Sequence, residues 1–519
     1  MKDTLGLIRT ALFAALIMGC AAADSNELMG LYSQADLEKT AAMKSYYAEG
    51  QIKLAGLNGT VSVYFVFPDK YRMNVSLSVL NITEVYNGRK GWMIDQNGQL
   101  VELKGHEKEN LINSVYLAGY SFLRPEGMKG DVALQGDTLI NDSLYKIFSS
   151  LPDGGDSLWL YYNTASERVE IIKEYLDEIV SFTYLQDFRV NDGFKIAFSS
   201  QVVSSLPALN ASVSYTKFEI NPELPDSLFD PAPGSFVDYE FPADLDSAVI
   251  PMVYHEGHIF IRANVNGDSS RYFILDSGAG LNILNKSYAD KIKVLSEGGF
   301  AAKGVAGYGE ASVGRIDSMI LGGIGLFNQS VAVTDLDQML KDFNGKNLGG
   351  IIGYDVLSRF PFKVDYASNQ LIFYRPDRFV PPDDYNVEEF EYFLKIPSAE
   401  VLIANDTGVF IIDLGNAYSV ILHNSFVERN NLEEKLKDLR KTDYAIGGIG
   451  GVTRVSTAFA PEFEIAGIKI ESQEVWIAES KGGVIGSEEI DGNIGNRLLE
   501  KFSIILDYRS KKMYIKPLL

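Results

Sequence analysis

The sequence predicts a mainly β protein, with an N-terminal open β-barrel that holds a packed helix, followed by a bilobal all-β half. Three patterns lead to this prediction: apolar residues alternating with period two, Asn-Gly pairs between the alternating stretches, and an internal repeat in the C-terminal half. The chain has 519 residues, which is too long for one hydrophobic core, so several domains are expected. An aromatic share of 12% and 47 glycines are typical of strands joined by tight turns.

The composition excludes several classes of partner. A formal net charge of −22, without a block of basic residues, repels phosphate backbones, so no nucleic-acid partner is expected. The single cysteine, Cys20, rules out an intrachain disulfide. His255-Glu256-Gly257-His258 lacks the spacing of a helical zinc motif, and no phosphate-binding loop or nucleophile elbow occurs, so we expect neither a metal nor a cofactor.

The first residues have the pattern of an export signal. Two basic residues, Lys2 and Arg9, precede an apolar run over 11–18 that is too short to span a bilayer. Gly19-Cys20 follows this run directly. This ending resembles the lipobox of bacterial lipoproteins, although Met18 is atypical there. The resemblance implies a signal peptide over 1–19, lipidation of Cys20, a tether over 20–26 and a lipid anchor in the bacterial cell envelope. No Asp follows the cysteine, which favours the outer membrane or periplasmic face over the inner membrane. A plain secretory signal with an incidental cysteine is the alternative.

Residues 27–235 are expected to form the first domain. Apolar positions at helical spacing predict one helix over 27–48, and about ten antiparallel strands follow, with the sheet wrapped round that helix. Val61, Val63 and Phe65 alternate with polar residues, as in a half-buried strand. Hairpin turns are predicted at Asn58-Gly59, Asn87-Gly88 and Asn97-Gly98.

The layout of this domain resembles the bacterial lipoprotein-carrier family (LolA/LolB type). The resemblance rests on the stretches MKSYYAEGQIKL, FVFPDKYRMNV, SLWLYYNTASERVEII and INPELPDSLFDPAP. It implies an open barrel and makes an acyl chain a candidate ligand, while a simple spacer domain is the alternative. The prolines that follow predict a linker over 236–250.

The C-terminal half contains five motifs that recur in the same order, 137 to 144 residues apart. This regularity predicts two equivalent lobes, over 251–380 and 381–519. The paired motifs are Asp276-Ser277-Gly278 with Asp413-Leu414-Gly415, Gly307-Tyr308-Gly309 with Gly448-Ile449-Gly450, Leu321–Ile324 with Ile465–Ile468, Ile351-Ile352-Gly353 with Asn493-Ile494-Gly495, and Asp365-Tyr366 with Asp507-Tyr508.

These motifs resemble those of the pepsin and retropepsin clan of aspartic peptidases, over about residues 250–519. The resemblance implies an aspartic-protease fold in which Asp276 and Asp413 face each other as the catalytic pair. It also implies loop support from Ser277, Gly278, Ala279 and Gly415, and a flap formed by Gly307, Tyr308, Gly309 and Ile449 that closes over a peptide or protein substrate. The tandem arrangement implies that a monomer completes its own site.

The residue types suit the chemistry. Two carboxylates a few ångströms apart share one proton, so one serves as general base and the other as general acid. The second lobe departs from the pattern, because Leu414 replaces the usual hydroxyl residue and Asn416 follows the glycine. Two hypotheses therefore remain open at this point: an envelope endopeptidase, or an inactive peptidase-like lipoprotein that binds lipid or lipoproteins.

Overall fold

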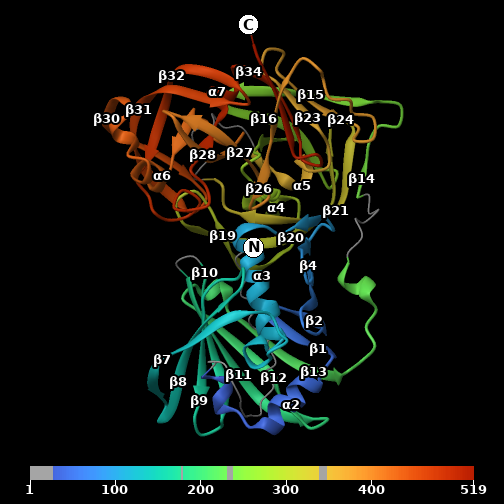
Figure 1. Ribbon diagram of the computed structural model, residues 1–519. Helices are drawn as coiled ribbons and strands as arrows, with labels where there is room; N and C mark the ends of the chain where they lie inside the picture. Colours follow the sequence, from blue (N-terminus) through green and yellow to red (C-terminus); the bar gives the residue numbers. More distant parts are fainter. Residues whose placement is uncertain (1–26, 177–178, 231–237, 338–347, 519) are drawn as a thin grey trace. The chain divides into compact units, whose positions relative to one another are not determined.

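The computed structural model describes residues 27–176, 179–230, 238–337 and 348–518. These residues form two compact units: one up to residue 230 together with Glu297–Ala301, and one of the remaining residues from 238 onward. Strands dominate both units (Figure 1), which confirms the mainly β fold class. The predicted export signal, Cys20 and the tether lie outside the described residues. Among the helices described, none is long and apolar enough to cross a membrane.

The first unit is built on one 13-stranded antiparallel sheet with the order β6-β5-β4-β3-β2-β1-β13-β12-β11-β10-β9-β8-β7. In β2 the register buries every second side chain from residue 61 onward, so Val61, Val63 and Phe65 point into the core as predicted. The strands are β1 (Ser45–Leu54), β2 (Leu57–Val66), β3 (Lys70–Leu77), β4 (Asn81–Asn87), β5 (Gly91–Ile94), β6 (Leu100–Glu102), β7 (Gly130–Ile140), β8 (Ser143–Pro152), β9 (Leu158–Asn163), β10 (Arg168–Leu176), β11 (Ile179–Asn191), β12 (Phe194–Ser204) and β13 (Ala211–Ile220). The helical elements are η1 (Met29–Leu31), α2 (Gln34–Ala42), α3 (Gly105–Ala118), η2 (Ser121–Leu123), η3 (Pro207–Leu209) and η4 (Asp226–Phe229).

Helix α3 lies inside the curve of this sheet (Figure 1). Leu111 of α3 leaves no room for a side chain at Gly91 of β5, while Tyr116 accepts a hydrogen bond from Ser150 of β8 at 3.1 Å. Since β5 and β8 stand near opposite ends of the strand order, the sheet must curl round α3 to reach both. The sequence pattern did not predict this helix, because its second half is buried on all sides and has no polar face.

Two local predictions for the first unit are wrong. Asn58-Gly59 lies within β2, and the turn occurs at Ala55-Gly56, where both residues have positive φ. The helix predicted over 27–48 is limited to α2, because Ser45 already pairs in β1. The turns at Asn87-Gly88 and Asn97-Gly98 are confirmed, each with a glycine at positive φ.

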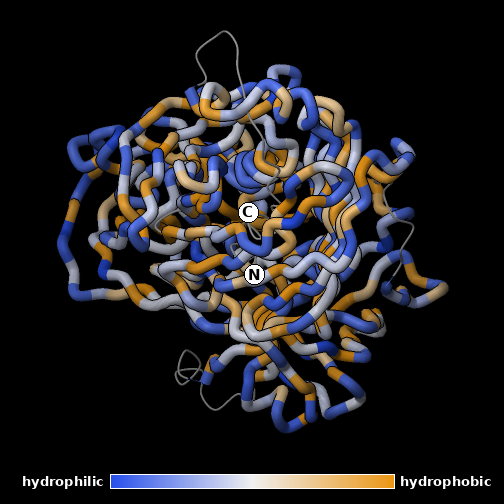
Figure 2. Tube along the Cα trace, turned by 90° about the horizontal axis from the view of Figure 1, so that it is seen from below, coloured by the Kyte–Doolittle hydropathy of each residue, from blue (hydrophilic) through white to orange (hydrophobic). Residues whose placement is uncertain are grey.

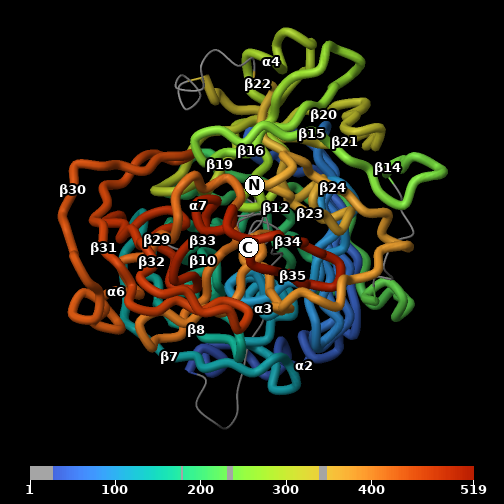
Figure 3. The backbone as a smooth tube through the Cα atoms, turned by 90° about the horizontal axis from the view of Figure 1, so that it is seen from above, coloured from blue at the N-terminus to red at the C-terminus, as the bar shows by residue number. Residues whose placement is uncertain are grey.

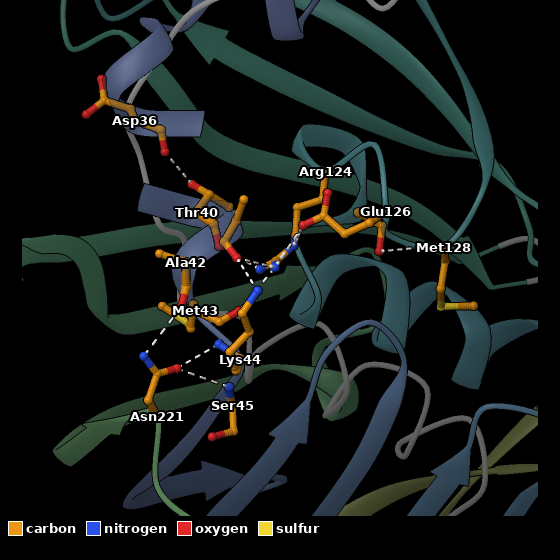
Figure 4. A network of polar contacts seen from close by, with 12 residues as sticks. Asp36, Thr40, Ala42, Met43, Lys44, Ser45, Arg124, Glu126, Met128 and Asn221 are labelled. Atoms are coloured by element: carbon orange, nitrogen blue, oxygen red, sulfur yellow. Dashed lines mark hydrogen bonds and ion pairs between the residues drawn. The ribbon is translucent and has the colours of Figure 1, made fainter. Parts of the chain in front are cut away.

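The buried Arg124 fastens α2 to this unit (Figure 4). Its guanidinium donates hydrogen bonds to the carbonyl oxygens of Thr40 at 2.7 Å, Met43 at 3.1 Å and Ala41 at 3.3 Å, and it lies 3.8 Å from the ring centre of Phe67. These carbonyls lie at the end of α2, which carries the negative end of the helix dipole, and that of Thr40 also accepts from the backbone amide of Met43 at 3.2 Å. A buried cation is therefore matched to the groups that need a donor.

The second unit contains a 14-stranded and an 8-stranded sheet. The first includes β14 (Tyr239–Glu240), β15 (Ser247–His255), β16 (His258–Val265), β17 (Arg271–Leu275), β18 (Ile283–Asn285), β19 (Ser296–Lys303), β20 (Tyr308–Leu321), β21 (Ile324–Thr334), β22 (Leu348–Ile352), β23 (Phe362–Asp365), β24 (Gln370–Tyr374), β25 (Asn386–Glu389), β34 (Phe502–Asp507) and β35 (Lys512–Pro517). The second includes β26 (Glu391–Phe393), β27 (Ile396–Ile403), β28 (Asp406–Ile412), β29 (Val420–Leu422), β30 (Lys437–Gly448), β31 (Gly451–Ile465), β32 (Ile468–Ala478) and β33 (Gly492–Ile494). The helices are α4 (Lys286–Lys291), α5 (Tyr354–Leu357), α6 (Asn424–Arg429), η5 (Leu432–Glu434) and α7 (Asn496–Leu499).

The repeated motifs have the same surroundings in both lobes. In the first lobe β22 pairs in parallel with β17 and antiparallel with β18. In the second lobe β33 pairs in parallel with β28 and antiparallel with β29. The C-terminal strands β34 and β35 lie beside β23 and β24 (Figure 3), so residues from the end of the chain extend the sheet of the first lobe. Part of the predicted linker over 236–250 is ordered strand, because β14 and the start of β15 lie within it.

Apolar and polar residues alternate over short stretches of the tube (Figure 2). In β24 this places Leu371 and Phe373 in the core, each completely buried, while the residues between them keep part of their surface exposed. Burial of one such large apolar side chain contributes roughly 1.5–3 kcal/mol. The alternation that predicted β-structure is thus the same feature that stabilises the sheets.

Replacement of Arg124 by alanine removes the three hydrogen bonds that its buried guanidinium donates to carbonyl oxygens at the end of α2. We expect the free energy of unfolding of the first unit to fall by about 2–4 kcal/mol, measured by urea denaturation. Lys90→Ala is the matched control, because its side chain is 58% exposed and pairs with Glu102 only at the surface. The control should change stability by less than about 0.5 kcal/mol. Equal losses for the two variants would contradict the anchoring role of Arg124.

Candidate active site

Two apolar strands deliver the paired aspartates. Strand β17 ends at Leu275, directly before Asp276, and β28 ends at Ile412, directly before Asp413; the last three residues of each strand are buried, and each strand pairs with a parallel neighbour. The amide of Asp276 donates to the carbonyl of Ile352, and that of Asp413 donates to the carbonyl of Ile494, both at 2.9 Å. Because these two backbone hydrogen bonds are equivalent, the backbones that carry the two carboxyl groups are held in the same way in both lobes.

Each loop orients its own carboxyl group. The amide of Gly278 donates to Oδ1 of Asp276 at 2.8 Å, and that of Gly415 donates to Oδ1 of Asp413 at 2.9 Å. The symmetry extends to Ala279, whose carbonyl accepts from the amide of Tyr354 at 2.9 Å. These amides leave the outer oxygens of both carboxyl groups available for other partners.

The two loops face each other at the closest approach that glycine permits. A Cβ at Gly278 would lie 2.5 Å from Oδ1 of Asp413, and one at Gly415 would overlap the carboxyl carbon of Asp276. The two carboxyl groups are themselves joined by a hydrogen bond. The structure therefore brings the predicted pair together, and glycine is required at both positions.

The electrostatics favour one shared proton. Loss of solvent raises the pKa of Asp276 well above its usual value, and the nearby Asp413 raises it further. Desolvation also raises the pKa of Asp413, although hydrogen bonds from Asn493 and Asp276 oppose this effect. Both side chains still keep some exposed surface, as a substrate-accessible site requires. Such a pair titrates as a unit and can hold one acid and one base at once.

Ser277 links the two loops. Its hydroxyl donates to the carbonyl of Ile412 at 2.6 Å and accepts from the amide of Leu414 at 2.9 Å, both across to the other lobe. Leu414 cannot return these bonds, and its side chain is completely buried instead. One arm of a reciprocal hydrogen-bond pair is thus present.

The buried Asn496 supplies a second tie that the sequence did not predict. Its amide donates to the carbonyl of Leu414 at 2.6 Å and to that of Gly257, in the β15–β16 turn, at 2.8 Å, while Tyr366 donates to its oxygen at 2.7 Å. Gly257 and Tyr366 belong to the first lobe. The loop that lacks a hydroxyl is therefore held to the opposite lobe from another side.

The glycine-rich segments of the two lobes meet. The amide of Val305 donates to the carbonyl of Ile449 at 2.7 Å, and a side chain at Gly307 or Gly309 would crowd residues 449–450. Tyr308 opens β20 and is half-buried. The first hairpin also receives hydrogen bonds from the amides of Val484 at 2.9 Å and Ile485 at 3.2 Å. The predicted flap residues thus lie in one interlocked group.

Asn493 is a further polar neighbour of the aspartate pair. Its Nδ2 lies 3.3 Å from Oδ2 of Asp413, and it occupies the position that Ile351 holds in the first lobe. The sequence held a signal for this contact, since Asn493 replaces an isoleucine in an otherwise apolar repeated motif. A polar side chain buried at such a position requires a hydrogen-bond partner. Among the residues described, no cluster of three or more His, Cys, Asp and Glu side chains could hold a metal ion.

Comparison with known proteins gives one sequence match, to an aspartyl protease family over residues 261–356. No curated protein matches the chain. Many solved structures are similar to parts of it, among them the following three. An aspartic proteinase from Irpex lacteus shares 12% identity, covering 52% of this chain and 97% of that one, with a TM-score of 0.35. A DUF1329 family protein from Desulfovibrio piger shares 13% identity, covering 39% and 95%, with a TM-score of 0.29. A domain named for outer membrane lipoprotein sorting, from Vibrio parahaemolyticus, shares 9% identity, covering 37% and 94%, with a TM-score of 0.29.

The sequence match supports one coarse statement. The second unit contains an aspartyl-protease-like domain, and the matched residues include Asp276 with its loop, the first flap segment and Ile351-Ile352-Gly353. Overall similarities with TM-scores below 0.5 do not establish a shared activity, so the sequence match is the comparison that bears on the site.

The raised pKa values predict a pH-dependent cost to stability. Between the ordinary aspartate pKa of 3.8 and the higher pKa of Asp276 in the folded state, the folded protein binds more protons than the unfolded chain, so stability falls as pH rises through this window. We therefore expect Asp276→Asn to raise the melting temperature at pH 7 by roughly 2–4 °C, and by less at pH 4.

Asp365→Asn is the control of opposite sign. Desolvation raises the pKa of Asp365, but hydrogen bonds from Ser368 and Lys363 outweigh it, so its pKa lies below the usual value. The unfolded chain binds more protons at this residue, and its substitution should lower the melting temperature at pH 7 rather than raise it. If Asp276→Asn instead lowers the melting temperature at pH 7 as much as Asp365→Asn does, the idea that the aspartate pair shares a proton is contradicted.

Proposed function

We propose that the second unit is an aspartic endopeptidase that hydrolyses peptide bonds with a water molecule activated between Asp276 and Asp413. The observation that carries the proposal is the close approach of two carboxyl groups at the ends of two equivalent strands, where burial raises the pKa of both and favours one shared proton. The aspartyl protease family match over residues 261–356 supports it. Peptide or protein substrates follow from the same chemistry.

The proposed reaction needs no group beyond the two carboxyls. The ionised carboxyl takes a proton from the water, whose oxygen forms a bond to the peptide carbonyl carbon, while the other carboxyl gives its proton to the carbonyl oxygen. The tetrahedral intermediate collapses when the carboxyl that took the water's proton passes it to the leaving nitrogen and the carbon–nitrogen bond breaks, while a hydroxyl of the intermediate returns its proton to the other carboxyl as the new carbonyl forms. The pair then again holds one proton. The interlocked hairpins near Val305 and Ile449 have to part before a substrate enters.

The replacement at Leu414 does not by itself argue for a decayed second lobe. Ser277 still bonds both the carbonyl of Ile412 and the amide of Leu414, and Asn496 anchors the Leu414 carbonyl from the other side. Both glycines of the pair are present, and Asp413 keeps its amide donors. These contacts support an active site over the alternative of an inactive binding scaffold.

The decisive experiment is cleavage of a diverse peptide library by the chain from residue 24 onward, from pH 3 to 8. Asp276→Asn and Asp413→Asn should each lower kcat/KM by at least about 10³-fold, since neither carboxyl can replace the other. Asp365→Asn, at the last residue of β23, is the matched control and should retain activity. Folded protein that cleaves no peptide at any pH would overturn the proposal and favour the binding scaffold.

We further propose that a lipid on Cys20 anchors the chain to the bacterial cell envelope. The support is the pattern of basic residues, apolar run and Gly19-Cys20 in the sequence. In a bacterial host the unchanged chain should fractionate with membranes, whereas Cys20→Ser should not. The intact mass should show a diacylglyceryl group on the cysteine of the first only. Ala22→Ser is the control and should remain in the membrane fraction. Soluble, unmodified protein with Cys20 intact would contradict the anchor.

A further inference from the structure

A buried polar chain lies behind Asp413 and is not used by the proposed reaction. From Oδ2 of Asp413 it runs to Nδ2 of Asn493 at 3.3 Å, and from Oδ1 of Asn493 to Nε2 of His423 at 3.0 Å. The other ring nitrogen, Nδ1, lies 2.8 Å from the carbonyl oxygen of Ile490. His423 is completely buried. One titratable ring is therefore joined to the aspartate pair through a single amide.

Only the second of the two lobes carries this chain among the described residues. Asn285 stands at the start of α4 as His423 stands at the start of α6, but its amide bonds Asp337 at 2.7 Å and its oxygen accepts from Leu336. Ile351 takes the place of Asn493 and has no polar atoms in its side chain. Asp413 therefore has a polar side chain, that of Asn493, behind its carboxyl group, whereas Asp276 has an apolar one at the equivalent position. A hydrogen bond from this side chain can distinguish the protonation states of the two aspartates.

Hydrogen-bond valence restricts the ring and the amide to two arrangements. The carbonyl of Ile490 only accepts, so Nδ1 of His423 always carries a hydrogen. If the ring is charged, Nε2 donates to the Asn493 oxygen, and the Asn493 amino group donates to an ionised Asp413. If the ring is neutral, Nε2 accepts, so Asn493 turns its amino group to the ring and its oxygen to Asp413. Oδ2 of Asp413 must then carry a proton to complete the bond.

Several groups act on the protonation of His423. Burial is the largest effect and holds the pKa of His423 below its usual value, although hydrogen bonds to Asn493 and Ile490 and the negative charge of Asp491 raise it in part. Asp491 lies on the segment before β33 and is partly neutralised by Arg429 of α6 at 2.6 Å. The same helix carries Glu428, and the aspartate pair itself faces the ring through Asn493.

We propose that His423, acting through Asn493, decides which aspartate holds the shared proton. A neutral His423 assigns the proton to Asp413 and leaves Asp276 as the general base; a charged His423 reverses this assignment. His423 is a positioning residue, and its consequence for cleavage rests on the proposed function. The coupling between His423 and Asp413 does not require activity.

The coupling can be measured on the full chain by NMR with histidine labelled at Cε1. The chain has four histidines, and His423→Asn, which copies Asn285, identifies the resonance. Asp413→Asn should lower the titration midpoint of His423 by about one pH unit, because it removes the anion that favours the charged ring. In the background of Asn493→Ile, which copies Ile351, the same substitution should shift the midpoint by less than about 0.3 unit. Equal shifts in both backgrounds, or no shift in either, would overturn the proposal.

A second variant covers the case in which Asn493→Ile does not fold. Asn493→Asp replaces the amide with a carboxylate that only accepts, so it should hold His423 charged and raise its midpoint by about one unit. An unchanged midpoint in this variant would also overturn the coupling.

The pH profile of kcat/KM tests the catalytic consequence. His423→Asn should move one limb of the profile by at least about half a pH unit, whereas His255→Gln, whose ring is partly exposed at the β15–β16 turn, should leave the profile unchanged. Identical profiles for His423→Asn and the unchanged protein would refute the positioning role. If the unchanged protein does not cleave peptides, the proposed function fails while the NMR midpoints still decide the coupling.

Discussion

The close approach of two Asp-x-Gly loops is the constraint on which the second unit depends. Gly278 and Gly415 each leave the space that the opposite carboxyl group fills, and a side chain at either would force the loops apart. The loops reach this distance because β17 and β28 are each held between two paired neighbours, one antiparallel and one parallel. Two carboxyls brought this close share a proton, so the backbone arrangement creates the acid–base chemistry.

The two lobes share a backbone plan but not their polar contacts. Ser277 gives the first loop a bond to each of two backbone groups in the second lobe, whereas the second loop is tied back through Asn496. Asn493 adds a polar contact behind Asp413 where the first lobe has Ile351. Duplication therefore supplies the geometry, and later differences between the copies can set the order of protonation within a nearly symmetric pair.

The first unit solves a different problem, which is how one long sheet buries one face. It curls round α3, so that a single helix contacts strands near both ends of the strand order. The ring of Tyr46 stacks between those of Phe65 and Phe218, with ring centres 5.5 Å and 5.1 Å away. This stack closes the core where β1 joins β13. Arg124 then satisfies the carbonyls at the end of α2.

The sequence by itself determined the β class, the repeat and the aspartate pair, because period-two alternation and Asp-x-Gly loops are local patterns. The catalytic roles of the paired residues stay predictions. Only the tertiary structure decided that α3 is the enclosed helix, that Asn58-Gly59 lies within a strand, and that His423 meets Asn493. Those two residues are 70 positions apart and come together only because β29 pairs with β33. A hydrogen bond between distant residues depends on strand pairing and register, which no local pattern of residues contains.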